Sequence, residues 1–343
     1  MRTTAVITGA GAGVGRATAR EFARQGCDVA LLARGEERLR NAAGEVRRFG
    51  VRALPLSIDV SDAAAVDTAA ERIEKELGPI DIWVNDAMVT IVAPVVEIDA
   101  DEFRRVTEVT YLGQVYGTMA ALKRMRPRNR GTIVQVGSAL SYRAIPLQSA
   151  YCGAKFAIRG FTDSLRSELA HEESRIRLTM VQLPAVNTPQ FDWALNRMAN
   201  ELQPVPPIYQ PEAIAREIVR AAHEAPRELW IGHSALKAIL GTMLFPQLGD
   251  RILASEGYTG QMTSEPRDKS RQNNLFTPVA GDPGARGRFD RRAHAEVVGF
   301  KPAWLRAAGY CALLAFVAGA YALGRSGREQ LPKAGPSPFT AAS

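Results

Sequence analysis

Hydrophobic positions follow two alternating patterns between residues 3 and 235. Short runs of apolar, often β-branched residues are typical of buried strands, and the longer stretches between them, with apolar residues every three or four positions, are typical of helices. The expected strands are Thr4–Thr8, Asp28–Leu32, Ala53–Ser57, Ile80–Val84, Thr132–Val136, Arg177–Gln182 and Glu228–Ile231. The expected helices are Gly13–Gln25, Glu36–Phe49, Ala63–Leu77, Asp101–Met125, Ala150–His171 and Pro211–Ala222. This alternation predicts an α/β fold with a doubly wound parallel sheet in one domain, residues 1–245.

The regular pattern fades beyond residue 245. Residues 255–300 are rich in Gly, Pro, Ser, Asn and Arg and poor in apolar side chains, so we expect a flexible basic linker over residues 246–302. Residues 307–324 then run for 18 positions without a charge. As a helix this span would be about 27 Å long, close to the ~30 Å hydrocarbon thickness of a bilayer. We expect a transmembrane anchor at residues 303–325 and a disordered tail at 326–343, and the alternative is a helix packed in an oligomer.

The net positive charge of the chain comes mainly from residues that follow the predicted domain. The formal charge is +7, but residues 1–250 contain 30 basic and 29 acidic side chains, whereas residues 251–343 contain 13 and 7. The basic cluster at residues 286–292 has no nucleic-acid-binding motif beside it, so no nucleic-acid partner is expected. Five basic residues between 288 and 306 precede the uncharged span and three between 325 and 333 follow it. The positive-inside rule therefore predicts a cytoplasmic location for the α/β domain.

Cysteine and histidine usage excludes two further classes of protein. Cys27, Cys152 and Cys311 lie far apart, and the four histidines never cluster at ligand spacing. We therefore expect a reduced compartment and no structural metal. The N-terminus also lacks the long apolar stretch of a signal peptide.

Glycines crowd the junction between the first expected strand and the first expected helix, where Thr8–Gly15 reads TGAGAGVG. Glycines let the backbone turn tightly and approach a pyrophosphate, and the N–H groups at the helix start stabilise its charge. A glycine-rich run alone is often only a turn. Its place in this β/α alternation predicts a dinucleotide site.

Further motifs follow at the ends of later strands. They are Asp59-Val60, Asn85-Asp86-Ala87, Ser138, the pair Tyr151 and Lys155, and Pro184–Thr188. With the glycine turn they resemble the short-chain dehydrogenase/reductase family over residues 3–235. The resemblance implies a Rossmann-type domain and hydride transfer between a nicotinamide cofactor and an alcohol or carbonyl carbon. It also implies a homo-oligomer assembled through the two longest helices, Asp101–Met125 and Ala150–His171.

The resemblance also implies a set of cofactor contacts. They are Gly9, Gly13, Val14, Gly15, Arg34, Asp59, Val60, Asn85, Ala87, Tyr151, Lys155, Pro184, Val186 and Thr188. By resemblance, Asp59 accepts a hydrogen bond from the adenine amino group and Thr188 contacts the nicotinamide carboxamide. Two positions depart from the family pattern, because Met88 and Ala185 stand where glycine is usual.

The end of the second strand bears on which nicotinamide cofactor is bound. An acidic side chain there would pair with a ribose 2′-hydroxyl, whereas a basic one would neutralise a 2′-phosphate. The sequence places Arg34 at this point and no acid. A guanidinium can hold a phosphate in bidentate fashion, so Arg34 favours NADP(H) over NAD(H). The alternative is a solvated arginine at the start of a helix.

Tyr151 and Lys155 are four residues apart in an expected helix, so both side chains lie on one face. A nearby ammonium favours the phenolate, so Lys155, together with the positive nicotinamide ring of the oxidised cofactor, is expected to lower the tyrosine pKa from its usual value of about 10 and make Tyr151 a general acid and base. A bare pair of this spacing is also compatible with a surface tyrosine beside a solvated lysine. Ser138 ends the fifth strand at the edge where ligands bind, and would orient the substrate oxygen.

Three further expectations concern the reaction. Thr110 stands where the family has a catalytic asparagine and is expected to contribute through its main-chain carbonyl. Phe191 and Trp193 lie in a segment that resembles a substrate lid, which favours an apolar carbonyl or alcohol substrate, although aromatic residues can also simply pack a lid shut. The alternatives are an NADP(H)-binding sensor or scaffold without turnover, and an epimerase or dehydratase on the same fold.

Overall fold

The computed structural model describes residues 2–303, 307, 309–311, 314 and 317–318. The chain divides into two compact units, residues 1–300 and residues 301–343, and each is considered by itself.

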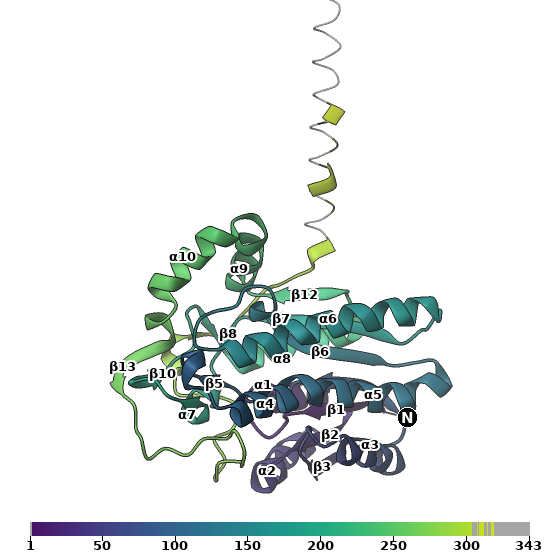
Figure 1. Cartoon of the computed structure of the whole chain (residues 1–343). Coiled ribbons are helices and arrows are strands. Elements are labelled where there is room, and N and C mark those ends of the chain that lie inside the picture. Colours follow the sequence, from purple (N-terminus) through teal and green to yellow (C-terminus); the bar gives the residue numbers. More distant parts are fainter. Residues whose placement is uncertain (1, 304–306, 308, 312–313, 315–316, 319–343) are drawn as a thin grey trace, which may run out of the picture. The chain divides into compact units, whose positions relative to one another are not determined.

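An eight-stranded sheet forms the centre of the first unit (Figure 1). In spatial order its strands are β15 (Gly299–Phe300), β12 (Glu228–Ile231), β7 (Arg177–Leu183), β6 (Thr132–Ser138), β4 (Ile80–Asn85), β1 (Thr4–Thr8), β2 (Asp28–Ala33) and β3 (Ala53–Ser57). The predicted strands are all present and pair in parallel, and β15 adds an antiparallel edge. The chain leaves β1 towards β2 and β3 and returns through β4 on the other side. This switch point is where open α/β sheets bind ligands.

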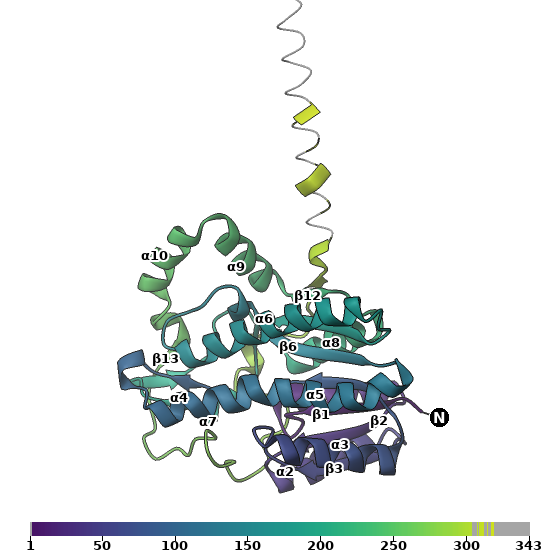
Figure 2. The ribbon, with the colours of Figure 1, turned by 45° about the vertical axis from the view of Figure 1, so that its right-hand side comes forward.

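Helices cover both faces of the sheet, as Figure 2 shows from a second side. One face packs against α1 (Gly13–Arg24), α2 (Glu36–Arg47) and α8 (Pro211–Glu224), and the other against α3 (Ala63–Leu77), α4 (Ala100–Thr107), α5 (Gly113–Met125) and α6 (Ser149–His171). Phe22 lies in the first core layer and Trp83 in the second, and both are fully buried. Burying a large apolar side chain contributes about 1.5–3 kcal/mol. The predicted doubly wound α/β fold is confirmed.

The long helix expected over Asp101–Met125 is interrupted. A π-helical turn, Glu108–Leu112, separates α4 from α5. Gly113 begins α5, and a Cβ there would lie 2.6 Å from a methyl carbon of Val60, so glycine lets the helix approach the end of β3 closely. Such π-turns often occur at functional sites, and this one carries Thr110.

Short elements form a rim around the carboxyl edge of the sheet. They are β5 (Ile91–Val92), β8 (Ala185–Val186), α7 (Gln190–Trp193), β9 (Leu195–Asn196), β10 (Asn200–Leu202) and β11 (Ile208–Tyr209). β5 pairs with β9 and β8 with β11, so the segment after β7 is tied to the loop after β4.

The flexible linker predicted for residues 246–302 is not what the structure shows, because residues 246–300 fold into the first unit. Helices α9 (His233–Leu244) and α10 (Pro246–Glu256) lead into β13 (Met262–Pro266), which pairs with β10. Further along, β14 (Ala293–His294) pairs with β11 and β15 with β12. Main-chain hydrogen bonds between these strands attach the segment to the first unit. Such bonds do not require hydrophobic side chains.

Residues 267–292, which we call the strap, run along the rim and are held largely by polar contacts. Ion pairs join Arg271 to Glu201 at 2.7 Å and Arg286 to Glu212 at 3.2 Å. Part of the positive charge after residue 250 therefore faces acids of the α/β domain. Partly exposed ion pairs of this kind each contribute only about 0–1 kcal/mol to the free energy of unfolding. They orient the strap more than they stabilise it.

The second unit begins at Lys301. The predicted anchor at residues 303–325 lies for the most part outside the described residues, and the predicted tail at 326–343 lies wholly outside them. Across the part of the chain that the structure describes, we find no helix with both the length and the apolar character needed to cross a bilayer.

Candidate active site

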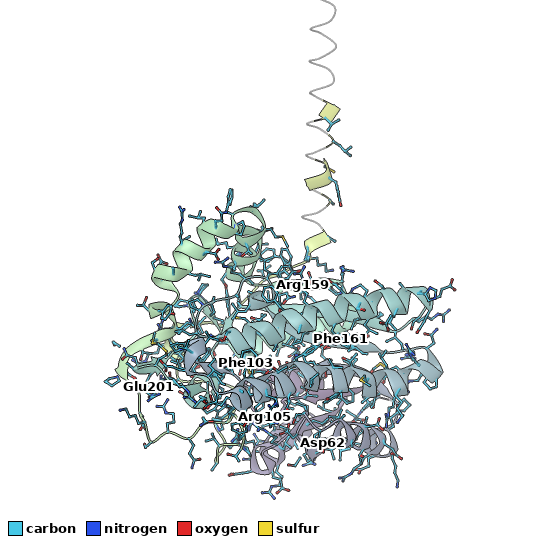
Figure 3. All side chains as sticks on the ribbon, in the orientation of Figure 1. Asp62, Phe103, Arg105, Arg159, Phe161 and Glu201 are labelled. Carbon is cyan, nitrogen blue, oxygen red and sulfur yellow. The ribbon has the colours of Figure 1, made fainter. Side chains whose placement is uncertain are left out.

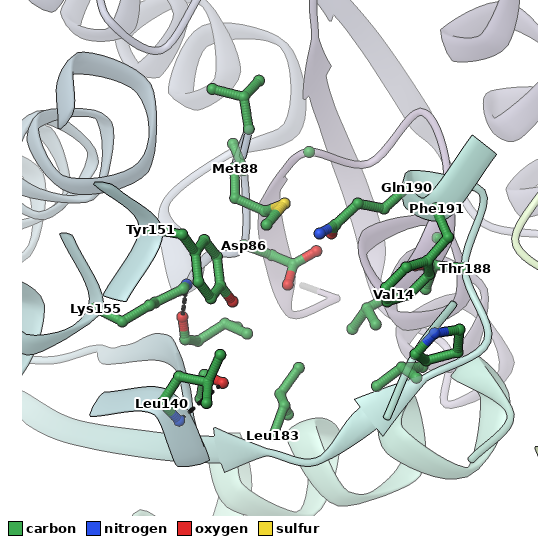
Figure 4. A pocket seen from close by; sticks show the side chains of 18 of the residues that line it. Val14, Asp86, Met88, Leu140, Tyr151, Lys155, Leu183, Thr188, Gln190 and Phe191 are labelled. Carbon is green, nitrogen blue, oxygen red and sulfur yellow. Dashed lines mark hydrogen bonds between the residues drawn. The ribbon is translucent and has the colours of Figure 1, made fainter. Parts of the chain in front are cut away.

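A cavity of about 550 Å³ opens at the carboxyl edge of the sheet (Figure 4). Its wall is formed by the glycine turn after β1, the ends of β2, β4, β6 and β7, the start of α6, the rim and two residues of the strap. Figure 3 shows how densely side chains fill the surrounding layers. The cavity lies at the switch point of the sheet, the place that the topology favours for a ligand.

The glycine turn is built for a close backbone approach. Gly9 has a positive φ of 74°, and a Cβ there would lie 2.9 Å from the Cα of Ala87. A Cβ on Gly15 would lie 2.6 Å from the carbonyl oxygen of Gly9. Helix α1 begins at Gly13 with no side-chain cap at Ala12, so the positive end of its dipole favours an anion. Two N–H groups of its first turn already have partners: that of Gly13 donates to the carbonyl oxygen of strap residue Gly284 at 3.3 Å, and that of Gly15 donates to the Asp86 carboxyl.

Ser138, Tyr151 and Lys155 converge on one side of the cavity. A hydrogen bond joins the Tyr151 phenol to the Ser138 hydroxyl, which also accepts from the N–H of Leu140 at 3.1 Å. The Lys155 ammonium lies 5.5 Å from the centre of the Tyr151 ring and donates to the carbonyl oxygen of Val136 at 2.7 Å. The spacing of four residues on α6 and the end of β6 thus place two hydroxyls and an ammonium together.

Burial dominates the electrostatics of this cluster. Desolvation raises the pKa of Tyr151 above its ordinary value, and the hydrogen bond with Ser138 only partly opposes this. Desolvation also lowers the pKa of Lys155 to about 8, opposed by the charge of Asp86. Among the described residues, desolvation of the phenol itself outweighs the groups that lower its pKa. The lowering expected from Lys155 together with an oxidised nicotinamide ring stays a prediction. The phenol stays protonated and can act as a proton donor.

Cationic side chains gather at the other end of the cavity, beside β2 and β3. Arg34 donates to the main-chain oxygens of strap residues 274–276, at 2.9 Å for Phe276, and lies 4.0 Å from Asp59. Arg105 of α4 also bonds to Asp59. Although burial opposes it, hydrogen bonds from Ser61 and Arg105 hold the pKa of Asp59 below its usual value. The carboxylate is thus ionised and already bonded on both oxygens.

The strap closes the rim on this side. Arg38 of α2 donates to the carbonyl oxygen of Gly281 at 3.1 Å, and its guanidinium lies 4.7 Å from the centre of the Trp193 ring. Asp282 forms an ion pair with Arg16 of α1 and accepts from Asn41 of α2 at 2.8 Å. The strap therefore contacts both α1 and α2 and connects them.

The sequence comparisons agree with this geometry. The profile of short chain dehydrogenases matches residues 3–198. An uncharacterized oxidoreductase of Bacillus subtilis, YxnA, is 32% identical over 309 residues, which cover 89% of this chain and 83% of the relative. The chain belongs to the short-chain dehydrogenase family.

Other members of the family are similar over smaller parts. The 3-dehydrosphinganine reductase of Danio rerio is 31% identical over 225 residues, covering 63% of this chain and 67% of the relative. A solved alcohol dehydrogenase of Thermococcus sibiricus, complexed with 5-hydroxy-NADP, is 28% identical with a TM-score of 0.58, covering 67% of this chain and 96% of that one. This short-chain dehydrogenase is thus an NAD(P)-dependent oxidoreductase.

Most residues predicted for the site line the cavity of this short-chain dehydrogenase. They are Gly9, Gly13, Val14, Arg34, Asp59, Val60, Ala87, Ser138, Tyr151, Lys155, Pro184, Val186 and Thr188. Gly15, Asn85 and Thr110 are not among the lining residues. Gly15 packs beneath Gly9, where it makes the tight turn possible.

The side chains of Asn85 and Thr110 make hydrogen bonds that hold parts of the fold of this short-chain dehydrogenase together. The buried Asn85 amide accepts from the indole of Trp83 at 2.8 Å and donates to Gln135 at 3.0 Å, so it links β4 to β6. The buried Thr110 hydroxyl donates to the carbonyl oxygen of Val89 at 2.8 Å and accepts from its N–H at 3.1 Å. Thr110 thus fixes the loop after β4 to the π-turn, and its side chain is not directed at the reacting groups.

The residues present fit a nicotinamide dinucleotide. The crowded glycine turn leaves no room for a Cβ at Gly9 or Gly15, as a pyrophosphate site requires. Lys155 is an almost fully buried ammonium, 2% exposed, in the same cavity as Tyr151. Arg34 supplies a partly buried cation at the opposite end. The cavity wall thus offers contacts for both ends of such a cofactor.

Sequence reasoning missed two features of this short-chain dehydrogenase. The first is the strap, which brings Asn274 and Pro278 into the cavity wall. Leu275 is fully buried, and the apolar pair Leu275-Phe276 in an otherwise polar stretch was the available signal. The second is Asp86, which lines the cavity and whose place inside a recognised motif could have drawn attention to its charge.

Proposed function

We propose that this short-chain dehydrogenase is an NADP(H)-dependent oxidoreductase that interconverts a ketone or aldehyde and an alcohol, with Tyr151 as general acid and base. The observation that carries the proposal is the convergence of Ser138, Tyr151 and Lys155 in a cavity that also contains the glycine turn. Arg34 at the far end supports the preference for a 2′-phosphate.

Each of the three side chains has its own role in the proposed reaction. Ser138 donates to the substrate oxygen and aligns it with the Tyr151 phenol, to which it is already bonded. In the reducing direction Tyr151 gives its proton to that oxygen, and in the oxidising direction it takes the alcohol proton. Lys155 stabilises the phenolate left after proton donation, because its ammonium lies close to the ring. The nicotinamide cofactor, when bound, supplies or accepts the hydride.

The cavity favours an apolar substrate at the end near Tyr151. The lining at this end, on the adjoining rim and on helices α9 and α10 includes the apolar side chains of Leu140, Ile145, Val205, Ala238 and Leu253. The two aromatic residues of the lid are partly engaged elsewhere, because Trp193 packs on a guanidinium and Phe191 packs edge-on against strap residue Phe289. Aliphatic side chains therefore support an apolar substrate better than the lid aromatics do.

A substrate screen tests this function. We expect NADPH absorbance to fall with apolar ketones or fatty aldehydes, and more slowly with small polar carbonyls, because aliphatic groups dominate the proposed substrate end. Steroids and retinoids belong in the same panel, with Tyr151→Phe protein as the blank. Cofactor binding without oxidation or reduction across the whole panel would contradict an enzymatic role and favour a sensor.

We also propose that residues 303–325 attach the protein to a membrane, on the strength of the 18 uncharged residues at 307–324. After cell lysis, the full chain is expected in the membrane pellet and a chain ending at Pro302 in the supernatant. Recovery of both forms in the supernatant would overturn the anchor. A smaller assembly size for the shortened chain would then favour the packed oligomer helix.

A further inference from the structure

Asp86 carries a partly buried carboxyl that the proposed reaction does not use. It follows β4 and lines the same cavity as Tyr151 and Lys155, as Figure 4 shows. In the motif that resembles the family's Asn-Asn-Ala-Gly, it replaces the second asparagine. The chain thus carries an ionisable group where a neutral amide of nearly the same shape would suffice for packing.

The main chain fixes the position of Asp86. Its N–H donates to the hydroxyl of Thr8 at 2.9 Å, and the carboxyl accepts from the N–H of Gly15 at the start of α1. A Cβ on Gly15 would lie 2.9 Å from one carboxyl oxygen, so the carboxyl rests against the glycine turn. The side chain is therefore held beside the turn on one side and the reacting groups on the other.

Few groups share this space with the carboxyl. From α6 it faces the Lys155 ammonium and the Tyr151 phenol, both of which interact with its charge. On the β1 side the neutral Thr8 hydroxyl is bonded to the main-chain N–H of Asp86. From α1 the carboxyl faces the N–H of Gly15 and the positive end of the helix dipole. Lys155 is thus the charged side chain that opposes Asp86 among the described residues.

Building on the proposed function, we propose that Asp86 supplies a negative charge that favours the oxidised, positively charged nicotinamide over the reduced one. The oxidised and reduced cofactors differ by one positive charge on the ring. A fixed, partly buried carboxylate in the cavity wall therefore stabilises the first more than the second, and Asp86 acts as a positioning residue through charge.

The titration of the carboxyl gives this effect a pH dependence. Burial raises the pKa of Asp86 to about 7, against the opposing charge of Lys155 and the N–H of Gly15. Above that pH the carboxyl is ionised and the preference for the oxidised cofactor is present. Below it the carboxyl is protonated and the preference is lost.

The test compares the Kd of NADP⁺ with the Kd of NADPH for wild type and Asp86→Asn at pH 8. Both forms carry the same phosphates, so the ratio isolates the charge of the ring. We expect Asp86→Asn to raise the ratio of Kd(NADP⁺) to Kd(NADPH) about tenfold. Asp67→Asn removes the same charge from α3, away from the cavity, and should leave the ratio unchanged.

A second measurement needs no variant. In wild type the ratio should rise between pH 8 and pH 6 as Asp86 is protonated, and in Asp86→Asn it should stay flat. Equal ratios in both proteins at pH 8, or a wild-type ratio that is constant over this range, would overturn the role of Asp86 while leaving the oxidoreductase proposal standing. Failure of wild type to bind either cofactor form would instead contradict the proposed function, and this inference with it.

Discussion

Replacing Tyr151 by phenylalanine is expected to lower kcat by about 10²–10⁴-fold, the range typical of losing a general acid and base. The phenol is the group that the structure joins to Ser138 and places near the Lys155 ammonium. Phenylalanine keeps the ring and its packing, so the Kd of NADPH should stay close to that of wild type. Steady-state kinetics with a substrate from the screen, together with cofactor titration, measure both quantities.

Tyr142→Phe is the matched control for that result. Its phenol is also buried and donates to Glu228 at 2.6 Å, but Tyr142 does not line the cavity. Its loss should lower Tm, because a buried carboxylate loses a hydrogen bond, and leave the kcat of the folded protein near wild type. A Tyr151→Phe enzyme that retained wild-type kcat would refute the mechanism.

Arg34→Ala is expected to lower kcat/KM for NADPH by about 10–100-fold and to change kcat/KM for NADH far less. A charge-assisted hydrogen bond to phosphate contributes about 1.5–3 kcal/mol, which corresponds to this range, and NADH has no 2′-phosphate to lose. Arg34→Lys should fall between the two proteins, because lysine keeps the charge without the planar fork. The ratio of kcat/KM for the two cofactors is the quantity to measure.

Arg34 also bonds to three carbonyl oxygens of the strap, so loss of strap contacts must be separated from loss of phosphate binding. Asp282→Asn weakens the strap at its ion pair with Arg16 and leaves Arg34 in place. This variant should lower Tm and affect both cofactors alike. A cofactor ratio that is the same in wild type and Arg34→Ala would reject the NADP(H) assignment.

The sheet and its covering helices could be predicted because each element carries its own signal. The strands β1 to β12 that form the parallel sheet are apolar enough to be recognised one by one, and helices such as α1 and α8 show an apolar stripe. The π-turn at Glu108–Leu112 has no such signal, since its apolar spacing still reads as a continuous helix. It is followed directly by Gly113, where α5 approaches Val60 closely.

Site residues that belong to a short motif could be predicted from the sequence. Side-chain orientation and pKa values could not, because they depend on burial and neighbouring charges. Tyr151, Lys155 and Ser138 come together because one helix and one strand end place them. Asn85 and Thr110 lie in recognised motifs, but their side chains turn to Gln135 and Val89 because buried amide and hydroxyl groups must find partners. The raised pKa of Tyr151 likewise follows from desolvation, which residue spacing does not reveal.

Local periodicity and short motifs are enough to predict the α/β fold, the glycine turn and the Tyr151–Lys155 pair. Residues 246–300 read as a basic linker, and it is their packing in the folded chain that makes them rim, strap and edge strand. Backbone carbonyls of the strap bond to Arg34, Arg38 and Arg105, and a carbonyl belongs to every residue type. Contacts made by the main chain leave no trace in hydrophobicity or composition, which is why the fold alone could show them.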